Sequence, residues 1–202
     1  MTPSKTLMKG ILAIAIASIA SGFAAAMPAS IETAGKTNPP IGHYEFCKLN
    51  RSECVPTVDD KGPAVLTEAR WKAMLTVNYE VNSTIEPMTD YDIYGVEERW
   101  AYPNQVGDCE DFVLEKRRQL IAAGFSPADL LITVVLQPNG EGHAVLTVRT
   151  DRGDFVLDNL RNRIMLWYDT EYTFLKRQAS YDPGRWVKLQ DGRAITAVAS
   201  TN

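Results

Sequence analysis

The sequence contains little cysteine and histidine, and it has no excess of basic residues. Three cysteines and two histidines occur among 202 residues, so chemistry that uses a thiol or an imidazole has few candidate side chains. The 21 lysines and arginines are outnumbered by 25 acidic residues, which gives a net charge of −4. The only basic cluster is 116–118, so the charge pattern gives no electrostatic argument for binding nucleic acid or an anionic membrane surface.

Internal repeats and low-complexity tracts are also absent. A composition of 45% hydrophobic and 23% charged residues is typical of a globular protein, and the length suits one domain with additional termini. We predict a folded domain over residues 43–190. A polar, proline-containing arm (27–42) precedes it, and a tail (191–202) follows it.

The N-terminal segment differs in composition from the rest of the chain. Two lysines precede an apolar stretch that begins at Ile11, and the alanines at 24–26 fit an A-x-A cleavage site. Residues 1–26 are therefore predicted to be a secretory signal peptide, which would place the mature protein in the periplasm or outside the cell. An uncleaved membrane anchor is the alternative, but serines and a glycine interrupt the alanine-rich run at 18–22.

Export changes the interpretation of the three cysteines, because an oxidising compartment favours disulfides. Cys47 and Cys54 can close an eight-residue loop, which the chain-entropy model values at about 2.5 kcal/mol. Cys109 is then left unpaired. An unpaired cysteine in an exported protein is an intermolecular linker or a reactive thiol, with an inert buried cysteine as the alternative.

Two helices are predicted in the first half of the domain. Residues 67–85 carry apolar side chains at four-residue spacing. A second helix over 109–123 can begin at Asp108 as N-cap, with Asp111 as an imperfect capping-box partner. Between the helices, residues 90–107 mix aromatic and acidic side chains and are predicted to form a loop, a type of segment that often carries function.

Cys109 begins the apolar stripe of the second predicted helix. At 100° per residue, its face is shared by Phe112, Val113, Lys116, Leu120 and Ala123. We expect the stem of Lys116 to pack on this face while its ammonium group reaches solvent.

Three strands are predicted after the second helix, at residues 130–137, 143–150 and 153–160. They are rich in valine, isoleucine and threonine, and short glycine-containing turns separate them, a pattern typical of an antiparallel meander. The aromatic segment from 161 to 189 is predicted to add a further hairpin.

A nucleophilic Cys109 would need a base and a group that orients the base. His43 is assigned to the polar arm, so the candidate base is His143. Asp158 is the candidate orienting group if residues 150–153 form a four-residue turn, because Asp158 then pairs with Val145. That register gives His143 and Asp158 a diagonal separation of about 7–8 Å between residues, which side chains can bridge.

The segments "GDCEDF" at a helix start, "HAVLTV" on one strand and "VLDN" on the next resemble the bacterial transglutaminase-like cysteine peptidases, the group that contains the LapG-type periplasmic proteases. The resemblance extends over residues 43–189 and includes "RWAYP" and "GRWVKL". It implies a papain- or transglutaminase-like α+β fold, in which N-terminal helices pack on an antiparallel β-sheet.

The resemblance also implies roles for individual residues. Cys109 would be the nucleophile, His143 the general base and acid, and Asp158 the orienting carboxylate. The backbone N–H of Cys109 could contribute to an oxyanion hole. Trp100 is a candidate for completing that hole, with a place in the core as the alternative.

Carboxylates beside Cys109 raise the energetic cost of a thiolate, and a bound cation would offset this cost. In LapG-type members the acidic residues that flank the cysteine bind calcium, which implies Asp108 and Glu110 as calcium ligands here. Two carboxylates are too few for calcium, and Asp90 and Asp92 are candidates for further ligands. The alternative is that the flanking acids only complement the helix dipole.

The resemblance implies an exported cysteine endopeptidase. In the resembling proteases the substrate is a large surface adhesin, whose cleavage releases cells from a biofilm, and a cyclic-di-GMP-controlled inner-membrane receptor sequesters the protease. Two alternatives remain open from the sequence. One is acyl transfer to an amine, as in transglutaminases, and the other is a non-catalytic, calcium-responsive binding module.

Overall fold

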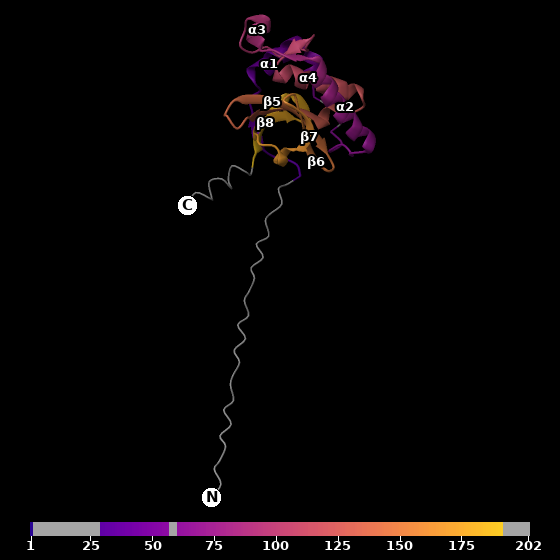
Figure 1. Cartoon of the computed structure of the whole chain (residues 1–202). Helices are drawn as coiled ribbons and strands as arrows, with labels where there is room; N and C mark the ends of the chain where they lie inside the picture. Colours follow the sequence, from indigo (N-terminus) through magenta and orange to yellow (C-terminus); the bar gives the residue numbers. More distant parts are fainter. Residues whose placement is uncertain (2–28, 57–59, 192–202) are drawn as a thin grey trace.

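The computed structural model describes residue 1 and residues 29–56 and 60–191 (Figure 1). The predicted signal peptide and all but the first residue of the predicted tail lie outside these ranges, apart from Met1. Within the described ranges, no helix combines the length and the hydropathy needed to cross a membrane.

The described residues form helices, short 3-10 turns and strands in a mixed order. The helices and 3-10 turns are α1 (Ile41–Leu49), η1 (Arg51–Cys54), α2 (Glu68–Thr84), α3 (Asp90–Tyr94), α4 (Cys109–Ala122), η2 (Pro127–Asp129) and η3 (Trp167–Asp169). The strands are β1 (Glu32–Thr37), β2 (Glu86–Pro87), β3 (Val106–Gly107), β4 (Leu130–Leu136), β5 (Gly142–Thr150), β6 (Gly153–Asp158), β7 (Arg161–Leu166), β8 (Thr173–Ala179) and β9 (Asp182–Gln190).

The central element is an antiparallel sheet with the strand order β1-β9-β8-β4-β5-β6-β7. The predicted meander corresponds to β4, β5 and β6, and the predicted hairpin corresponds to β8 and β9. In Figure 1 the helices lie together on one side of the strands. The α+β class with helices on an antiparallel sheet is therefore confirmed.

Each face of the sheet contributes to a separate apolar core. On the helix side, Leu146 and Val148 of β5 pack in one cluster with residues of α2 and α4. On the other side, Val145 of β5 belongs to a cluster with Trp167 and Phe174. Because both faces are covered, β4 carries the nearly continuous apolar sequence "LLITVVL" instead of an alternating one.

The prediction of a polar arm over residues 27–42 is wrong for residues 32–37 and 41–42. Residues 32–37 form β1, which pairs with β9 at the edge of the sheet, and α1 begins at Ile41. An edge strand is held by backbone hydrogen bonds and can keep polar, exposed side chains, so the sequence of β1 gives no apolar alternation.

The predicted loop 90–107 contains a short helix, α3, and the two-residue strand β3. Thr89 caps α3, because its hydroxyl oxygen accepts a hydrogen bond from the N–H of Asp92 at 3.2 Å. Gly95 ends α3 in the left-handed conformation, with φ of 71°. This turn of helix places the carboxylate of Asp90 in the interior, next to the start of α4.

Candidate active site

Cys109 is the first residue of α4, as predicted, but the Asp108 half of the predicted capping box does not form. Asp108 occupies the N-cap position without a side-chain capping hydrogen bond. The Oδ1 atom of Asp111 accepts a hydrogen bond from the backbone N–H of Ala101 at 2.8 Å, so this carboxylate secures the preceding loop. The first turn of α4 is thus left with acidic side chains that do not cap it.

The buried face of α4 is wider than its apolar stripe. Phe112, Val113 and Leu120 are buried as predicted, whereas Ala123 is exposed. Lys116 is fully buried, which contradicts the expectation that its ammonium group reaches solvent. The reason is that both α2 and β5 pack on α4, so the side chain of Lys116 is enclosed.

The predicted register between β5 and β6 is confirmed. Thr150 pairs with Gly153 and Leu146 pairs with Leu157, so Asp158 continues the register opposite Val145. The Nε2 atom of His143 lies 2.9 Å from Oδ1 of Asp158, and both residues are buried. The sheet thus brings together the imidazole and the carboxylate that the sequence pattern selected.

The carboxylate of Asp158 accepts hydrogen bonds from several groups. Although burial opposes ionisation, hydrogen bonds from His143 and Tyr172 and from the backbone N–H of Leu160 hold the pKa of Asp158 below its ordinary value. An ionised carboxylate only accepts hydrogen bonds, so Nε2 of His143 carries the proton in this contact. The Nδ1 atom is then available as a base.

Cys109 and His143 line one pocket of about 290 Å³, together with Glu98, Trp100 and Glu110. The thiol of Cys109 is half-buried and donates a hydrogen bond to Oε2 of Glu110 at 3.3 Å. Burial, and then the charge of Glu110, raise the pKa of this thiol well above its usual value, against a hydrogen bond from the N–H of Ala144. The acidic residues thus oppose a thiolate, as expected from the sequence.

An acidic cluster lies beside the thiol. Carboxylate oxygens of Asp90, Asp108 and Glu110 lie within 4.8 Å of one another. Each of these residues has a buried oxygen that finds no hydrogen-bond partner among the described residues, and so does Asp111. Asp92 is not part of the cluster, since its carboxylate accepts a hydrogen bond from the hydroxyl of Thr89.

Burial is the main cause of the raised pKa values in the acidic cluster. It raises the pKa of Glu110 to about 10, with a further contribution from the hydrogen bond and charge of Asp108. It raises the pKa of Asp111 to about 7 and also raises that of Asp90. Converging, partly unsatisfied carboxylate oxygens are the ligands that calcium prefers, so these residues fit a calcium ion.

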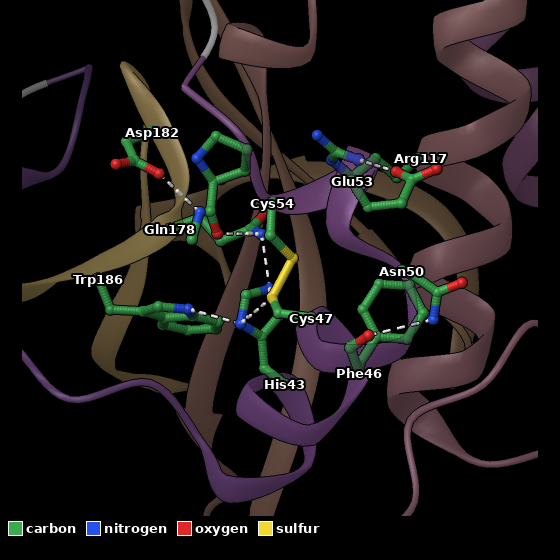
Figure 2. Close-up of a disulfide and its surroundings, with 12 residues drawn as sticks. His43, Phe46, Cys47, Asn50, Glu53, Cys54, Arg117, Gln178, Asp182 and Trp186 are labelled. Atoms are coloured by element: carbon green, nitrogen blue, oxygen red, sulfur yellow. Dashed lines mark hydrogen bonds and ion pairs between the residues drawn. A yellow bond between two sulfur atoms is a disulfide. The ribbon is translucent and has the colours of Figure 1, made fainter.

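The assignment of His43 to a polar arm is wrong, because this residue is buried in α1. Figure 2 shows its ring between the disulfide and Trp186. The Nε1–H of Trp186 donates to Nδ1 of His43 at 3.2 Å, and burial lowers the pKa of His43 to about 4. The predicted disulfide between Cys47 and Cys54 is present, so His43 has a structural role beside it.

Trp100 is both a core residue and a residue of the pocket wall. It is buried and stacks edge-on against His43 and Trp186. Its indole N–H donates to Oε1 of Glu98 at 2.7 Å, so in this arrangement the N–H is not directed at an oxyanion.

Tyr172, Arg161 and Glu98 are contacts of the site that the sequence analysis did not select. Tyr172 and Arg161 bond to Asp158, and Glu98 lines the pocket. No local spacing links these residues to Cys109 or His143, because the sheet and the loop before α4 bring them together. Of these three residues, only Glu98 could have been suspected from the sequence, because it is one of several acidic residues in the loop predicted at 90–107.

Three solved structures of LapG from Legionella pneumophila are similar to this chain. The calcium-bound form has 25% sequence identity and a TM-score of 0.47, and the match covers 53% of this chain and 64% of that chain. The EGTA-treated form has 21% identity and a TM-score of 0.49, with 64% and 76% covered. A third LapG structure has 22% identity and a TM-score of 0.50, with 77% and 83% covered, and shows the same transglutaminase-like fold.

No curated protein is significantly similar to this chain. The family model described as bacterial transglutaminase-like cysteine proteinase BTLCP matches residues 33–194. This match includes the helix start with Cys109 and the strands with His143 and Asp158. The chain therefore belongs to the family of bacterial transglutaminase-like cysteine proteinases.

Proposed function

We propose that this protein is an exported cysteine endopeptidase whose catalytic residues are Cys109, His143 and Asp158. The observation that carries the proposal is that His143 lines the same pocket as Cys109 and is hydrogen-bonded to the buried Asp158 behind it. The bond fixes the proton on Nε2, and His143 can then take the thiol proton on Nδ1. Family membership supports a protein as the substrate.

The reaction proceeds through an acyl-enzyme. The sulfur of Cys109 attacks the peptide carbonyl carbon, and His143 donates the proton it took from the thiol to the leaving amine. His143 next takes a proton from water, whose oxygen attacks the thioester carbon and releases the acid, and the proton returns to the sulfur. The backbone N–H of Cys109 stands at a helix start without an intrahelical acceptor, which makes it a donor for the oxyanion.

Calcium binding to the acidic cluster is part of the proposal. Asp90, Asp108 and Glu110 would hold the ion, and the unpartnered oxygen of Asp111 is directed into the same acidic surroundings. A bound cation would supply positive charge next to the thiol. Glu110 would then direct its charge to the cation, which removes the main electrostatic obstacle to a thiolate at Cys109.

The proposed substrate is a large surface adhesin, and the proposed location is the periplasm. The resemblance of the motifs to LapG-type proteases and the predicted signal peptide at residues 1–26 support both. A cyclic-di-GMP-controlled inner-membrane receptor is the corresponding regulatory partner. Release of the adhesin from the cell surface would be the outcome of cleavage.

The test is to incubate the mature protein with surface proteins of the same bacterium, in calcium and with a labelled primary amine. Two fragments that are absent with Cys109→Ala and with His143→Ala would support an endopeptidase. A labelled or crosslinked product without fragments would show acyl transfer instead. Calcium-dependent binding that is equal in the wild type and in Cys109→Ala, without any product, would show a non-catalytic binding module.

A further inference from the structure

We infer that Tyr172 and Arg161 are positioning residues, which hold Asp158 in the one orientation that keeps His143 in its productive tautomer. The inference rests on the proposed function of the Cys109, His143 and Asp158 set. It adds two residues to that set, and both bond to Oδ2, the carboxylate oxygen of Asp158 that does not accept from the imidazole.

Among the described residues, the carboxylate of Asp158 accepts four hydrogen bonds, two on each oxygen. Oδ1 accepts from Nε2 of His143 at 2.9 Å and from the N–H of Leu160 at 3.0 Å. Oδ2 accepts from the hydroxyl of Tyr172 at 2.6 Å and from Nε of Arg161 at 3.1 Å. Because Oδ2 is held by two donors, the carboxylate cannot rotate about its Cβ–Cγ bond without breaking both contacts.

Arg161 and Tyr172 are themselves fixed to each other. The Nη2 atom of Arg161 donates to the hydroxyl oxygen of Tyr172 at 2.9 Å, which directs the hydroxyl proton to Asp158. Arg161 also bonds to both carboxylate oxygens of Glu171, at 3.0 Å through Nη1 and at close range through Nη2. Tyr172 is buried, and its ring lies 5.6 Å from the ring of His143 in a tilted arrangement.

Neighbouring elements leave few other groups near Asp158. From α2, the side-chain amide of Asn82 donates to the backbone oxygen of Asp158, so it does not hold the carboxylate. From α4, the buried ammonium of Lys116 acts on Asp158 through its charge, and its Nζ makes no hydrogen bond within the described residues. Directional control of Oδ2 therefore comes from Tyr172 and Arg161.

The chemical consequence concerns the imidazole. A fixed Oδ1 accepts from Nε2–H, and the proton is then absent from Nδ1, the nitrogen that must act as base. If Oδ2 loses its donors, the carboxylate can turn and the Nδ1–H tautomer becomes populated. A purely structural role is the alternative, in which the same bonds only close the turn between β6 and β7.

The test measures the tautomer of His143 and the reactivity of Cys109 in the mature protein with calcium present, the condition in which the proposed function predicts a reactive thiol. Nitrogen-15 chemical shifts of the imidazoles, recorded where they are neutral, report which ring nitrogen carries the proton. The chain has only two histidines, and His43 serves as an internal reference because its contacts are remote from Asp158. The rate of alkylation by iodoacetamide reports the activation of the thiol.

We expect a single Nε2–H tautomer in the wild type. Tyr172→Phe keeps the ring and removes one donor, and we expect a tautomer mixture and an alkylation rate lowered about tenfold. Arg161→Met should act in the same direction, and Arg161→Lys should restore part of the rate. The matched control is Tyr168→Phe, since Tyr168 packs against the same apolar cluster as Tyr172 but is not a partner of Asp158.

Wild-type tautomer and rate in Tyr172→Phe and Arg161→Met would overturn the inference, provided that His143→Ala loses the reactivity. That result would leave the proposed function intact, and it would mean that the bonds of Tyr172 and Arg161 to Asp158 only stabilise the turn between β6 and β7. If His143→Ala also keeps the wild-type rate, both the inference and the proposed function are wrong. Circular dichroism of each variant checks that the fold is retained.

Discussion

At the residue scale, the state of the thiol of Cys109 is decided by opposing neighbours. The helix start, the imidazole of His143 and the N–H of Ala144 favour a thiolate. Burial and the carboxylate of Glu110 oppose it and have the larger effect on the pKa of the thiol. The proposed activation of Cys109 therefore requires a cation at the acidic cluster as well as the histidine.

Lys116 is a residue whose removal should stabilise the fold. Burial lowers its pKa to about 7, partly offset by the charge of Asp158, and its ammonium has no hydrogen-bond partner in the part of the chain that the structure describes. We predict that Lys116→Met raises the free energy of unfolding by about 1–3 kcal/mol at pH 7, measured by urea unfolding. The carboxylate of Asp158 tolerates the loss of the Lys116 charge, because hydrogen bonds satisfy both of its oxygens.

The sign of the pH dependence gives a second check on Lys116. Its pKa is lower in the folded than in the unfolded state, so the destabilising contribution of Lys116 shrinks as the pH rises from about 7 toward about 10. The advantage of Lys116→Met should therefore shrink at pH 9. Lys48→Met, at an exposed lysine, is the control. If the Lys116→Met variant is less stable than the wild type at pH 7, this account of Lys116 is wrong.

At the element scale, the disulfide-closed segment from Cys47 to Cys54 supports α4 through one ion pair. Figure 2 shows Glu53 of this segment beside Arg117 of α4. The contact between Nη1 of Arg117 and Oε2 of Glu53 is 3.2 Å, and Nε of Arg117 donates to the backbone oxygen of Leu130. The guanidinium is buried, so its charge relies on Glu53.

Glu53→Gln should lower the free energy of unfolding by about 1–3 kcal/mol, because it leaves the buried charge of Arg117 without its counterion. The matched control is Glu45→Gln, whose partner Lys48 is exposed, and there we expect no measurable loss because solvent screens the pair. Chemical denaturation of both variants measures the difference. Equal losses would show that the segment does not stabilise α4 through this pair.

Sequence reasoning predicted the elements where the pattern is local. The helix after Asp108, the meander and the four-residue turn before Asp158 all follow from periodicity or turn chemistry, and all are present. The edge strand β1 and the burial of His43 and Lys116 did not follow, because they depend on elements that are distant in sequence. The same holds for the site. Local patterns indicated its three proposed catalytic residues, but not Arg161 and Tyr172, which bond to Asp158 from the following strand and loop.

At the scale of the whole molecule, the raised pKa values of the acidic cluster make stability depend on pH, and the proposed calcium site would make it depend on calcium as well. A carboxyl whose pKa is higher in the folded state binds its proton more tightly there, so stability is lost as the pH rises from the unfolded toward the folded pKa. For Asp111 this range runs from about 4 to about 7. For Glu110 the loss continues toward about 10.

We predict that, in EGTA, the Tm falls by about 5 °C or more between pH 5 and pH 8. Calcium at one hundred times its Kd should restore about 2.7 kcal/mol at pH 8, and magnesium should restore less. Asp90→Asn should weaken the calcium response, whereas Asp92→Asn, on the same helix but outside the cluster, should keep it. Calorimetry measures each effect, and a Tm that rises with pH in EGTA would refute the prediction.

The most direct test of the central claim is the rate of alkylation of Cys109 by iodoacetamide in the mature protein, measured from pH 5 to pH 10. The series compares the wild type with His143→Ala, each in calcium and in EGTA. The account predicts fast alkylation near neutral pH only in the wild type with calcium, and a shift of the rate profile to higher pH in EGTA. A profile that neither His143→Ala nor EGTA changes would contradict the assignment of Cys109 as an activated nucleophile.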